Sequence, residues 1–357
     1  MSLDELRDKI DKIDTELLRL LNERADVVHG VGEIKKRDDL EIYAPDREEK
    51  LLRKLVEKSE GRLPEKSIRA IYREIMSAAL ALEDDLKIAY LGPAGTWTHQ
   101  AAISKFGHSV EFQPQASFAD VFEQVVRKQA DYGVVPIENS TEGAVTHTLD
   151  LFADSPLKIY GQVMLSIENN LMANCAREEI KEIYTHPQVI AQCRGWLHKH
   201  FGETPTVECS STAAAAELVA KKPGTAVLGG TLLAEMYELD ILEKCIQDIA
   251  GNTTRFLVIS HRTCPPTGDD RTSVMFSVND EPGSLHRALE PFEKFSINMS
   301  KIESRPSKRR AWEYFFFVDL AGHCEDAEIK DALNQLSKNC SFTKVLGSYP
   351  SCKPVNA

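Results

Sequence analysis

Several charged side chains in the first 85 residues occupy positions where a helical pattern otherwise supplies apolar residues. Arg24 falls in a stripe of Leu, Ile and Val spaced three and four apart, and Glu48 and Glu83 each share a helix face with apolar residues. A buried charge must be paired or functional. Either Arg24 and Glu48 form an interhelical ion pair or extend to solvent, or Arg24 belongs to a cationic set around a small dianion. That set comprises Arg7, Arg24, Lys35 and Arg47.

Hydroxyl-bearing turns form a second candidate group in the middle of the chain. The runs LGPAGT, PIENSTEG and CSST each end a predicted strand and open a helix, and the run NTTRF follows near residue 252. Helix N-termini bind carboxylates without a fixed positive charge. Ordinary N-capping accounts for any one of these turns alone, whereas all of them together indicate carboxylate binding. The chain has neither a dinucleotide fingerprint nor a P-loop.

The elements that must position the charged set are helices. Apolar periodicity predicts a helix over 2–36, a second beginning near Pro45 and a third over 64–83. The first helix would be about 50 Å long, while a compact domain of this size is about 30 Å across. We therefore expect a second copy of the chain to cover its apolar stripe.

Two further segments have different patterns. From residue 87 to about 260, β-branched runs alternate with helical stretches, which predicts an α/β domain with parallel sheets. Residues 271–349 follow the strand, helix, strand, strand, helix, strand order of a ferredoxin-like fold. Composition changes near Asp84 and Asp85 and in the Pro- and Gly-containing stretch 262–270. The predicted domains are 1–85, all-α; 86–262, α/β; and 271–350, α+β.

Composition narrows the class of protein. The 357 residues carry 43 Lys and Arg against 55 Asp and Glu, and a net charge of −12 opposes nucleic-acid or anionic-membrane binding. No apolar run approaches the ~18 residues of a membrane span, and the charged N-terminus lacks a signal-peptide core, so we expect a cytoplasmic protein. The eight cysteines are scattered without metal-site spacing, so we expect them to be reduced, mostly buried and inert.

The first segment resembles the all-helical chorismate mutases. The matching residues are Leu6–Ile10, Leu21-x-x-Arg24, Val31-Gly32-x-x-Lys35 and Pro45-x-Arg47-Glu48. The resemblance implies that Arg24, Arg47 and an Arg7 donated across a dimer hold the two carboxylates of chorismate, with Glu48 beside them. It also implies that Lys35 faces the ether oxygen. This pericyclic rearrangement requires only a compact conformer and donors to the oxygen that gains charge.

Two positions depart from the best-known bacterial form of that family. Glu83 stands where that form has Gln beside the ether oxygen, and Ala44 stands where it has Asp before Arg47. An ionised Glu83 would repel the developing charge, so we expect Glu83 to act in its protonated form. The mutase rate should then decline as pH rises, and Glu83→Gln should flatten the profile.

The middle segment resembles prephenate dehydratase through GPxGT, GVVPIENSTEG and TTRFLVI. That family has two α/β lobes like a periplasmic binding protein, with the active site between them. The resemblance implies that the Thr254 hydroxyl assists departure of the ring hydroxide as carbon dioxide leaves, with Arg255 positioning the substrate or polarising the junction. The residues that would hold the carboxylates are Thr96, Asn139, Ser140, Thr141, Ser211 and Thr212.

The last segment resembles an ACT regulatory domain through two motifs. These are Gly283-Ser284-Leu285-His286 and Ile302-Glu303-Ser304-Arg305-Pro306. In dehydratases these motifs line a phenylalanine site at a dimer interface. The alternative is a ferredoxin-like domain used only for oligomerisation, in which His286 packs at an interface.

The three resemblances, in this order, imply a bifunctional chorismate mutase/prephenate dehydratase of phenylalanine biosynthesis. Neither reaction needs a metal or a redox cofactor. Phenylalanine is the expected effector, and the expected assembly is a homodimer, possibly paired into a tetramer. Two alternatives stay open: a dehydratase with an inactive mutase domain, and a ligand-sensing binding protein whose helices serve only as a dimerising handle.

Overall fold

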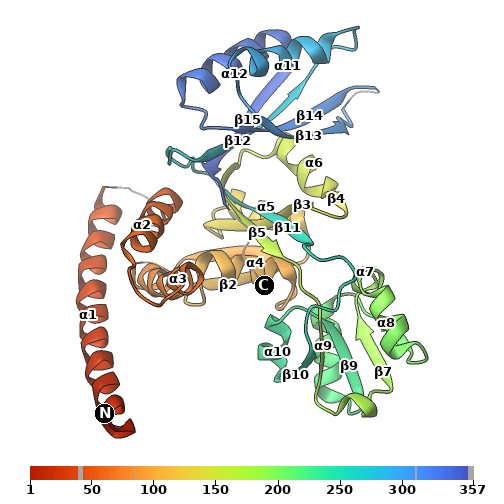
Figure 1. The fold of residues 1–357 in the computed structure, drawn as a ribbon. Coiled ribbons are helices and arrows are strands. Elements are labelled where there is room, and N and C mark those ends of the chain that lie inside the picture. Colours follow the sequence, from red (N-terminus) through yellow and green to blue (C-terminus); the bar gives the residue numbers. More distant parts are fainter. Residues whose placement is uncertain (39–42, 84, 310–311, 353–357) are drawn as a thin grey trace. The chain divides into compact units, whose positions relative to one another are not determined.

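The computed structural model describes residues 1–38, 43–83, 85–309 and 312–352. The chain divides into two compact units (Figure 1). The helical unit comprises residues 1–87 together with 105–111, and the second unit comprises residues 88–104 and the chain from 112 onward. Of the two residues that mark the first predicted change in composition, Asp85 is described, whereas Asp84 lies outside the described residues.

The helical unit contains the three predicted helices. They are α1 (Leu3–Arg37), α2 (Pro45–Lys58) and α3 (Glu65–Glu83). Ser2 forms a capping box with Glu5 at the start of α1, and Pro45 occupies the first turn of α2. A Cβ added at Gly32 of α1 would lie 2.9 Å from Cγ of Glu83, so this glycine lets α1 approach α3 closely.

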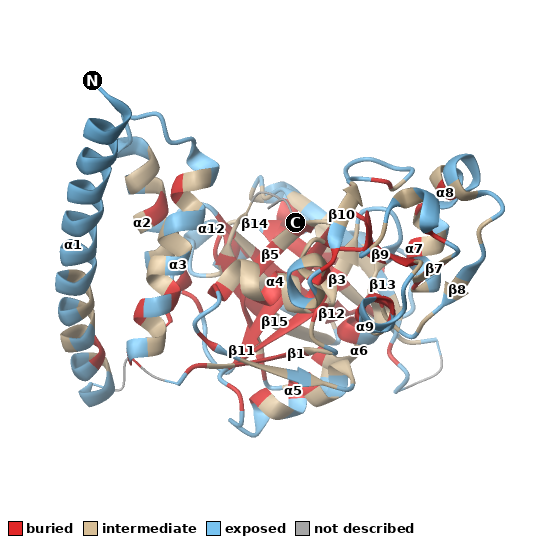
Figure 2. Ribbon diagram, turned by 90° about the horizontal axis from the view of Figure 1, so that it is seen from below, coloured by how far each residue is buried: buried red, intermediate tan, exposed pale blue. Residues whose placement is uncertain are grey.

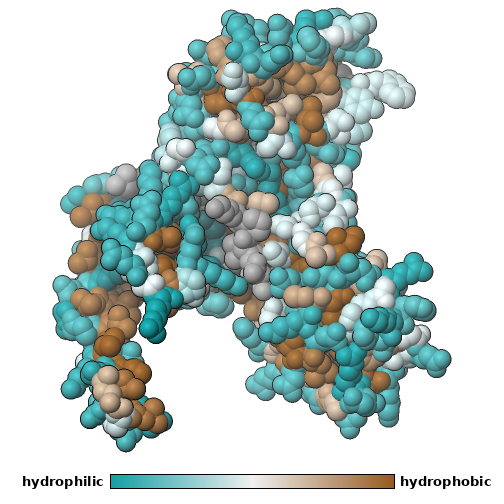
Figure 3. Space-filling view, in the orientation of Figure 1, coloured by the Kyte–Doolittle hydropathy of each residue, from teal (hydrophilic) through white to brown (hydrophobic). Residues whose placement is uncertain are grey.

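The apolar stripe of α1 is exposed in a single chain. Its only buried residue is Gly32, and Figure 2 shows the helix almost entirely in the colour of exposed residues. Apolar patches follow it in the space-filling view (Figure 3). The large exposed side chains include Leu3, Leu6, Ile10, Ile13, Leu17, Leu20, Val27 and Ile34. The helical unit therefore leaves uncovered the face that the sequence pattern marks as apolar.

Residues 105–111 pack within the helical unit. The rings of Phe106 and Tyr43 lie 4.9 Å apart, and these side chains are 1% and 3% exposed. Gly107 adopts φ +71°, and a Cβ there would lie 2.4 Å from Cβ of Ser77 on α3. The Ser109 amide donates to the Ser77 hydroxyl at 3.0 Å. This segment is therefore part of the core of the helical unit.

Two mixed sheets build the α/β region. The first lobe has strand order β2-β1-β3-β11-β5, with β4 beside β3, and the second has β10-β6-β9-β7-β8. The first lobe contains β1 (Lys87–Leu91), α4 (Trp97–Phe106), β2 (Glu111–Gln115), α5 (Phe118–Val126), β3 (Tyr132–Asn139), β4 (Gly143–Ala144), α6 (Thr146–Asp154), β5 (Lys158–Ser166) and β11 (Thr253–Ser260). The second contains β6 (Asn170–Ala173), a 3-10 turn (Arg177–Glu179), β7 (Glu182–Thr185), α7 (Pro187–Gln192), α8 (Arg194–Phe201), β8 (Thr206–Glu208), α9 (Thr212–Lys221), β9 (Thr225–Gly229), α10 (Leu232–Tyr237) and β10 (Asp240–Glu243).

The expectation of parallel sheets is wrong for part of each lobe. Strands β1 and β3 are parallel, as are β7, β8 and β9, but β11 runs antiparallel to both β3 and β5. Strand β6 runs antiparallel to β9 and to β10. The chain leaves the first lobe after β5 and returns as β11, and this return sets the direction of β11. A short β-branched run does not reveal that direction.

The C-terminal segment has the predicted ferredoxin-like order. Its elements are β12 (Asp270–Ser277), α11 (Ser284–Lys294), β13 (Met299–Pro306), β14 (Tyr314–Ala321), α12 (Ala327–Asn339) and β15 (Phe342–Pro350), with sheet order β13-β14-β12-β15. Both helices cover one face of this sheet (Figure 1). The other face contributes Met275, Phe317 and Tyr349 to the core of the first lobe. A Cβ at Gly347 would lie 2.2 Å from the Ile159 carbonyl oxygen, so β15 contacts β5 directly.

Two smaller expectations can also be compared with the structure. No helix in the described ranges is both long and apolar enough to cross a membrane. All eight cysteines are free, but only Cys193 and Cys264 are buried, and Cys245 is exposed. The expectation that most cysteines are buried is therefore wrong, because five of them lie in partly exposed loops, turns or element ends.

Candidate active sites

A cavity of about 360 Å³ in the helical unit brings together most of the predicted mutase residues. Its lining includes Arg24, Val28, Val31, Lys35, Tyr43, Ala44, Arg47, Glu48, Leu51, Tyr72, Met76, Ala79 and Glu83. All three helices contribute, because helical spacing directs Arg24 and Lys35 from α1, Arg47 and Glu48 from α2, and Glu83 from α3 to one space. Hydrophobic walls surround the charged groups, and such walls strengthen electrostatic attraction to a bound anion.

The charges in this cavity fall into two groups. Lys35 Nζ lies 3.0 Å from Glu83 Oε2, and their side chains are 15% and 6% exposed. In contrast, neither Arg24 nor Arg47 forms an ion pair with any described residue. The Arg24–Glu48 ion pair that the sequence left open is therefore not formed within the described ranges. The two guanidinium groups are available for an anionic ligand.

Arg7 does not line this cavity. Its side chain is 66% exposed and lies 3.6 Å from Asp4. Arg24 lies seventeen positions after Arg7 along α1, which corresponds to about 25 Å of helix. Arg7 of the same chain therefore cannot reach a ligand held by Arg24.

Sequence reasoning missed a cation near Glu48. Lys105 Nζ lies 3.9 Å from Glu48 Oε2, and these side chains are 20% and 16% exposed. Lys105 also lies 5.8 Å from the centre of the Tyr43 ring. Lys105 lies in the segment with the α/β pattern and outside the mutase motifs. The sequence therefore contains no indication of this contact.

The dehydratase candidates meet where β3 ends and β11 begins. Asn139 and Thr254 are register partners, and the Asn139 amide nitrogen donates to the Thr254 hydroxyl and to the Asn252 side-chain oxygen, both at 2.8 Å. Thr254 and Asn252 are 9% and 4% exposed. The Thr254 oxygen thus accepts a hydrogen bond, which leaves its own hydrogen free to donate to another group.

The turn after β3 is held against the same strand. The Asn139 side-chain oxygen accepts from the Thr141 amide at 2.9 Å and from the Thr141 hydroxyl at 2.7 Å. Ser140 donates its amide to the Thr253 carbonyl at 2.8 Å, and its hydroxyl accepts from the Thr253 amide at 2.9 Å. Asn252 belongs to this network but was not among the predicted site residues, although it lies two positions before Thr254.

Two of the other predicted hydroxyls, those of Thr96 and Ser211, bond to nearby backbone groups. The Thr96 hydroxyl donates to the Leu91 carbonyl at 3.0 Å, and the Ser211 hydroxyl accepts from the Ala214 amide at 3.0 Å. Thr212 is buried. The two lobes meet beside these turns, because a Cβ at Gly95 would lie 3.4 Å from Cβ of Ala213. Each of these turns follows the end of a strand. They therefore lie at the carboxyl-terminal edges of the sheets, where open α/β sheets bind ligands.

Arg255 does not point toward Thr254. Its guanidinium lies 2.6 Å from Asp319 of β14, and both side chains are 5% exposed. Successive side chains of a strand point to opposite faces, so Arg255 faces the C-terminal domain while Thr254 faces the Asn139 network. This geometry contradicts the expectation that Arg255 contacts substrate or polarises the Thr254 junction. Burial lowers the pKa of Arg255, whereas the neighbouring Tyr349 hydroxyl and the carboxylates of Asp319 and Glu138 raise it, and the net effect is a rise.

The two predicted phenylalanine motifs lie on separate elements. Gly283 has φ +79° at the start of α11, Ser284 is buried, Leu285 is partly buried and His286 is exposed. On β13, Glu303 and Arg305 are partly buried and Ser304 and Pro306 are exposed. Within the described ranges, no hydrogen bond or ion pair joins the two motifs.

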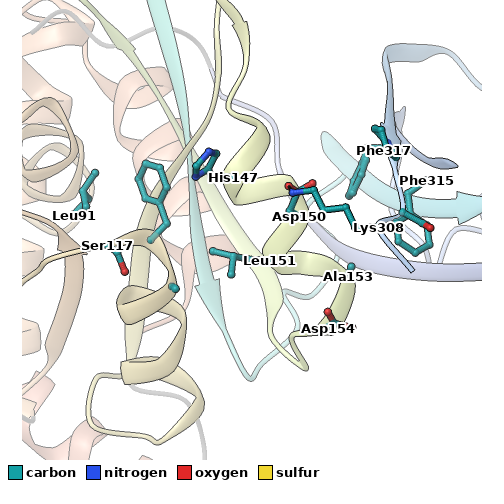
Figure 4. Close-up of a pocket in the computed structure, with 14 residues that line it drawn as sticks. Leu91, Ser117, His147, Asp150, Leu151, Ala153, Asp154, Lys308, Phe315 and Phe317 are labelled. Carbon is teal, nitrogen blue, oxygen red and sulfur yellow. Dashed lines mark hydrogen bonds and ion pairs between the residues drawn. The ribbon is translucent and has the colours of Figure 1, made fainter. Parts of the chain in front are cut away.

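A second cavity, of about 530 Å³, lies where α6 faces the C-terminal domain (Figure 4). Pro306 is the only predicted site residue in its lining. Asp150 lies 2.7 Å from Lys308 Nζ and 3.5 Å from Arg305. Burial alone would raise the pKa of Asp150, but these two cations lower it. Among the residues that the structure describes, no group of three or more His, Cys, Asp or Glu side chains could hold a metal ion.

Comparisons with known proteins agree with the order of the three segments. The chorismate mutase type II model matches residues 6–84, the prephenate dehydratase model matches 88–264 and the ACT domain model matches 272–338. Fold and site together define a multidomain enzyme of aromatic amino acid biosynthesis with two catalytic domains and an ACT domain.

Two relatives match this chain over nearly its whole length. The bifunctional chorismate mutase/prephenate dehydratase of Aquifex aeolicus is 48% identical over 98% of both chains, and that of Neisseria gonorrhoeae is 45% identical over 98% of both. The chain belongs to the family of bifunctional chorismate mutase/prephenate dehydratases. A solved prephenate dehydratase from Arthrobacter aurescens, in complex with L-Phe, is 34% identical and covers 74% of this chain and 90% of its own, with a TM-score of 0.69.

Proposed function

We propose that the chain rearranges chorismate to prephenate in the helical unit and converts prephenate to phenylpyruvate, water and carbon dioxide in the α/β lobes. The observation that carries this proposal is the meeting of Arg24, Lys35 and Arg47 in one cavity and of Asn139 and Thr254 at one strand edge. We keep 1–85, 86–262 and 271–350 as the proposed domains and a cytoplasmic location for this biosynthetic enzyme.

In the mutase reaction, Arg24 and Arg47 hold the carboxylates of the dianion, and Lys35 donates to the ether oxygen as its bond breaks. Such fixed donors lower the barrier because they meet charge where it develops. Lys35 Nζ lies 3.0 Å from Glu83 Oε2. In its protonated form Glu83 would add a second hydrogen-bond donor near the ether oxygen. The rate should therefore fall as pH rises in the native enzyme and change less in Glu83→Gln.

In the dehydratase reaction, Thr254 donates its hydrogen bond to the departing ring hydroxyl. Asn139 supports this role because its amide donates to the Thr254 oxygen, which makes the hydroxyl hydrogen more acidic. Loss of carbon dioxide supplies the electron pair that completes the aromatic ring as hydroxide leaves. The turn at Ser140 and Thr141, together with the turns at Thr96, Ser211 and Thr212, holds the substrate carboxylates.

The mutase site is completed by a homodimer. The exposed apolar face of α1 needs a cover, and Arg7 lies about 25 Å of helix away from Arg24 of its own chain. Arg7 of the partner subunit would supply the third guanidinium. Mixing Arg7→Ala with Arg24→Ala chains should restore part of the mutase activity that each lacks alone. Sedimentation would separate dimer from tetramer, and absence of restored activity in a proven hybrid would refute donation across the dimer.

Phenylalanine is the proposed effector. An ACT domain and a relative solved with L-Phe support this assignment. The proposed ligand residues are Gly283, Ser284, Leu285, His286, Glu303, Ser304, Arg305 and Pro306. Inhibition requires that phenylalanine bind two states of the enzyme with different affinities. Dehydratase rates measured against phenylalanine concentration test the assignment, and a flat response would remove it.

The direct test of the function follows both turnovers in one preparation. Loss of chorismate and formation of phenylpyruvate have distinct ultraviolet signals. We expect both. Phenylpyruvate formation from prephenate alone would favour the alternative of an inactive mutase domain, and absence of both turnovers would favour a ligand sensor.

A further inference from the structure

Four charged side chains form a cluster between the first lobe and the ACT domain. They are Glu138 of β3, Arg255 of β11, Lys301 of β13 and Asp319 of β14. Arg255 lies 2.6 Å from Asp319 and 3.7 Å from Glu138, and Lys301 lies 3.1 Å from Glu138. Arg255 and Asp319 are each 5% exposed and Lys301 is 10% exposed. Glu138, at 36% exposed, lies at the edge of the cluster, so the buried part consists of Arg255, Asp319 and Lys301.

The lobe side of this cluster is adjacent in sequence to the dehydratase site. Glu138 precedes Asn139, and Arg255 follows Thr254. Glu138 and Arg255 are register partners, as are Asn139 and Thr254. Because side chains alternate along a strand, each of these two strands presents one residue to the site and the next residue to the cluster. The register of β3 and β11 shifts immediately after Arg255, and such bulges re-aim side chains beside active sites.

The ACT side of the cluster is equally ordered. Lys301 and Asp319 are register partners on β13 and β14. The Ser273 hydroxyl donates to Asp319 at 2.5 Å and lies 2.6 Å from the Tyr349 hydroxyl. Arg271 lies 3.9 Å from Asp319. Burial would raise the pKa of Asp319, but Arg255, Ser273 and Arg271 lower it, with a net decrease. Asp319 therefore stays ionised and keeps Arg255 in one place.

We propose that Asp319 and Lys301 of the ACT domain are positioning residues of the dehydratase site. Asp319 fixes Arg255, and Lys301 fixes Glu138, so the two strands hold Thr254 and Asn139 at the distance that their hydrogen bond requires. The ACT domain is thereby a structural part of the catalytic site, in addition to any regulatory role. This inference rests on the proposed dehydratase function.

The first experiment compares Asp319→Asn with Asp331→Asn, the same change at an exposed position of α12. Asp319→Asn removes the nearer anion of the buried Arg255, leaves only the more distant Glu138, and should shift β11. Displacements of about 1 Å at a site cost up to about a hundredfold in rate. We therefore expect Asp319→Asn to lower kcat for prephenate by roughly ten- to a hundredfold with little change in KM, while mutase activity and the Asp331→Asn control keep native rates.

A double-mutant cycle separates positioning from direct contact with substrate. If Arg255 acts through Asp319, the double variant Arg255→Gln with Asp319→Asn should lose no more activity than the worse single variant. Effects that multiply would show that Arg255 acts on the substrate by itself and would overturn the proposal. Native kcat in Asp319→Asn would overturn it as well.

A second break in the cluster keeps the proposal testable if Asp319→Asn does not fold. Lys301→Met removes the partner of Glu138 and leaves the Arg255–Asp319 ion pair intact. It should also lower kcat for prephenate while thermal unfolding stays cooperative, and a native kcat would refute the role of Lys301. Absence of phenylpyruvate formation by the native chain would instead refute the dehydratase function itself.

Discussion

The two candidate sites handle dicarboxylates with opposite electrostatics. In the helical unit, full charges on Arg24 and Arg47 line an apolar cavity and have no ion-pair partner among the described residues. At the dehydratase site, neutral groups of Asn139 and Thr254 line the edge, and the adjacent Arg255 is buried on the opposite face. The cations of the helical unit, Arg24 and Arg47, are therefore placed to bind a ligand. Arg255, in contrast, is placed to stabilise the fold around the dehydratase site.

The largest expected difference concerns stability. Asp319→Asn removes the nearer of the two anions beside the buried Arg255 and should lower the free energy of unfolding of the second unit by about 3–5 kcal/mol. Arg24→Gln should change it by less than about 0.5 kcal/mol, because Arg24 is partly exposed and has no ion pair in the described chain. Chemical denaturation of both variants measures the contrast, and equal losses would break it.

The ion pair of Asp319 with Arg255 also predicts that the stability of the protein depends on pH. The pKa of Asp319 is lowered in the folded state, so its stabilisation is present above its unfolded value of about 4 and is lost as pH falls through the folded value. The difference in melting temperature between the native chain and Asp319→Asn should therefore be constant above about pH 5 and shrink below about pH 4. A difference that grows on acidification would contradict this charge assignment.

The next effect concerns the hydroxyl of Thr254. Thr254→Val keeps the shape but removes the donor, and the loss of one such donor costs about a hundred- to a thousandfold in kcat. Thr254→Ser keeps the donor and should stay within about tenfold of the native rate. Steady-state rates with prephenate compare the two variants, and equal losses would assign Thr254 a packing role.

Ionic strength should separate the two sites without mutation. Free guanidinium groups attract a dianion through a field that salt screens over about 10 Å at 0.1 M. KM for chorismate should therefore rise several-fold between low and high salt, while KM for prephenate changes less because neutral donors hold it. The reverse order would contradict the contrast between the sites.

The smallest effect concerns Ala44. This residue stands at the N-cap of α2 and makes no side-chain hydrogen bond to the helix. Ala44→Asp should cap α2 and stabilise the helical unit by about 1 kcal/mol, measured as a higher melting temperature. An added anion beside Arg47 should at the same time weaken chorismate binding if Arg47 holds a carboxylate, and an unchanged KM would question that role.

The sequence predicted elements better than relations between distant elements. The three helices, the ferredoxin-like order and the cavity residues on α1, α2 and α3 follow from periodicity and local motifs. The direction of β11 and the contact of Arg255 with Asp319 do not, because each depends on where the chain returns after crossing between lobes. Lys105 near Glu48 was missed because its partner lies 57 residues earlier in the chain, in a segment with a different pattern.

The account depends most on the separation of the two sites within one chain. The decisive measurement is a paired assay of both turnovers in Arg24→Ala and in Thr254→Ala, each against the native chain. The account predicts that Arg24→Ala loses chorismate turnover and keeps prephenate turnover, and that Thr254→Ala does the opposite. Loss of both activities in either folded variant, or of neither in both, would contradict it.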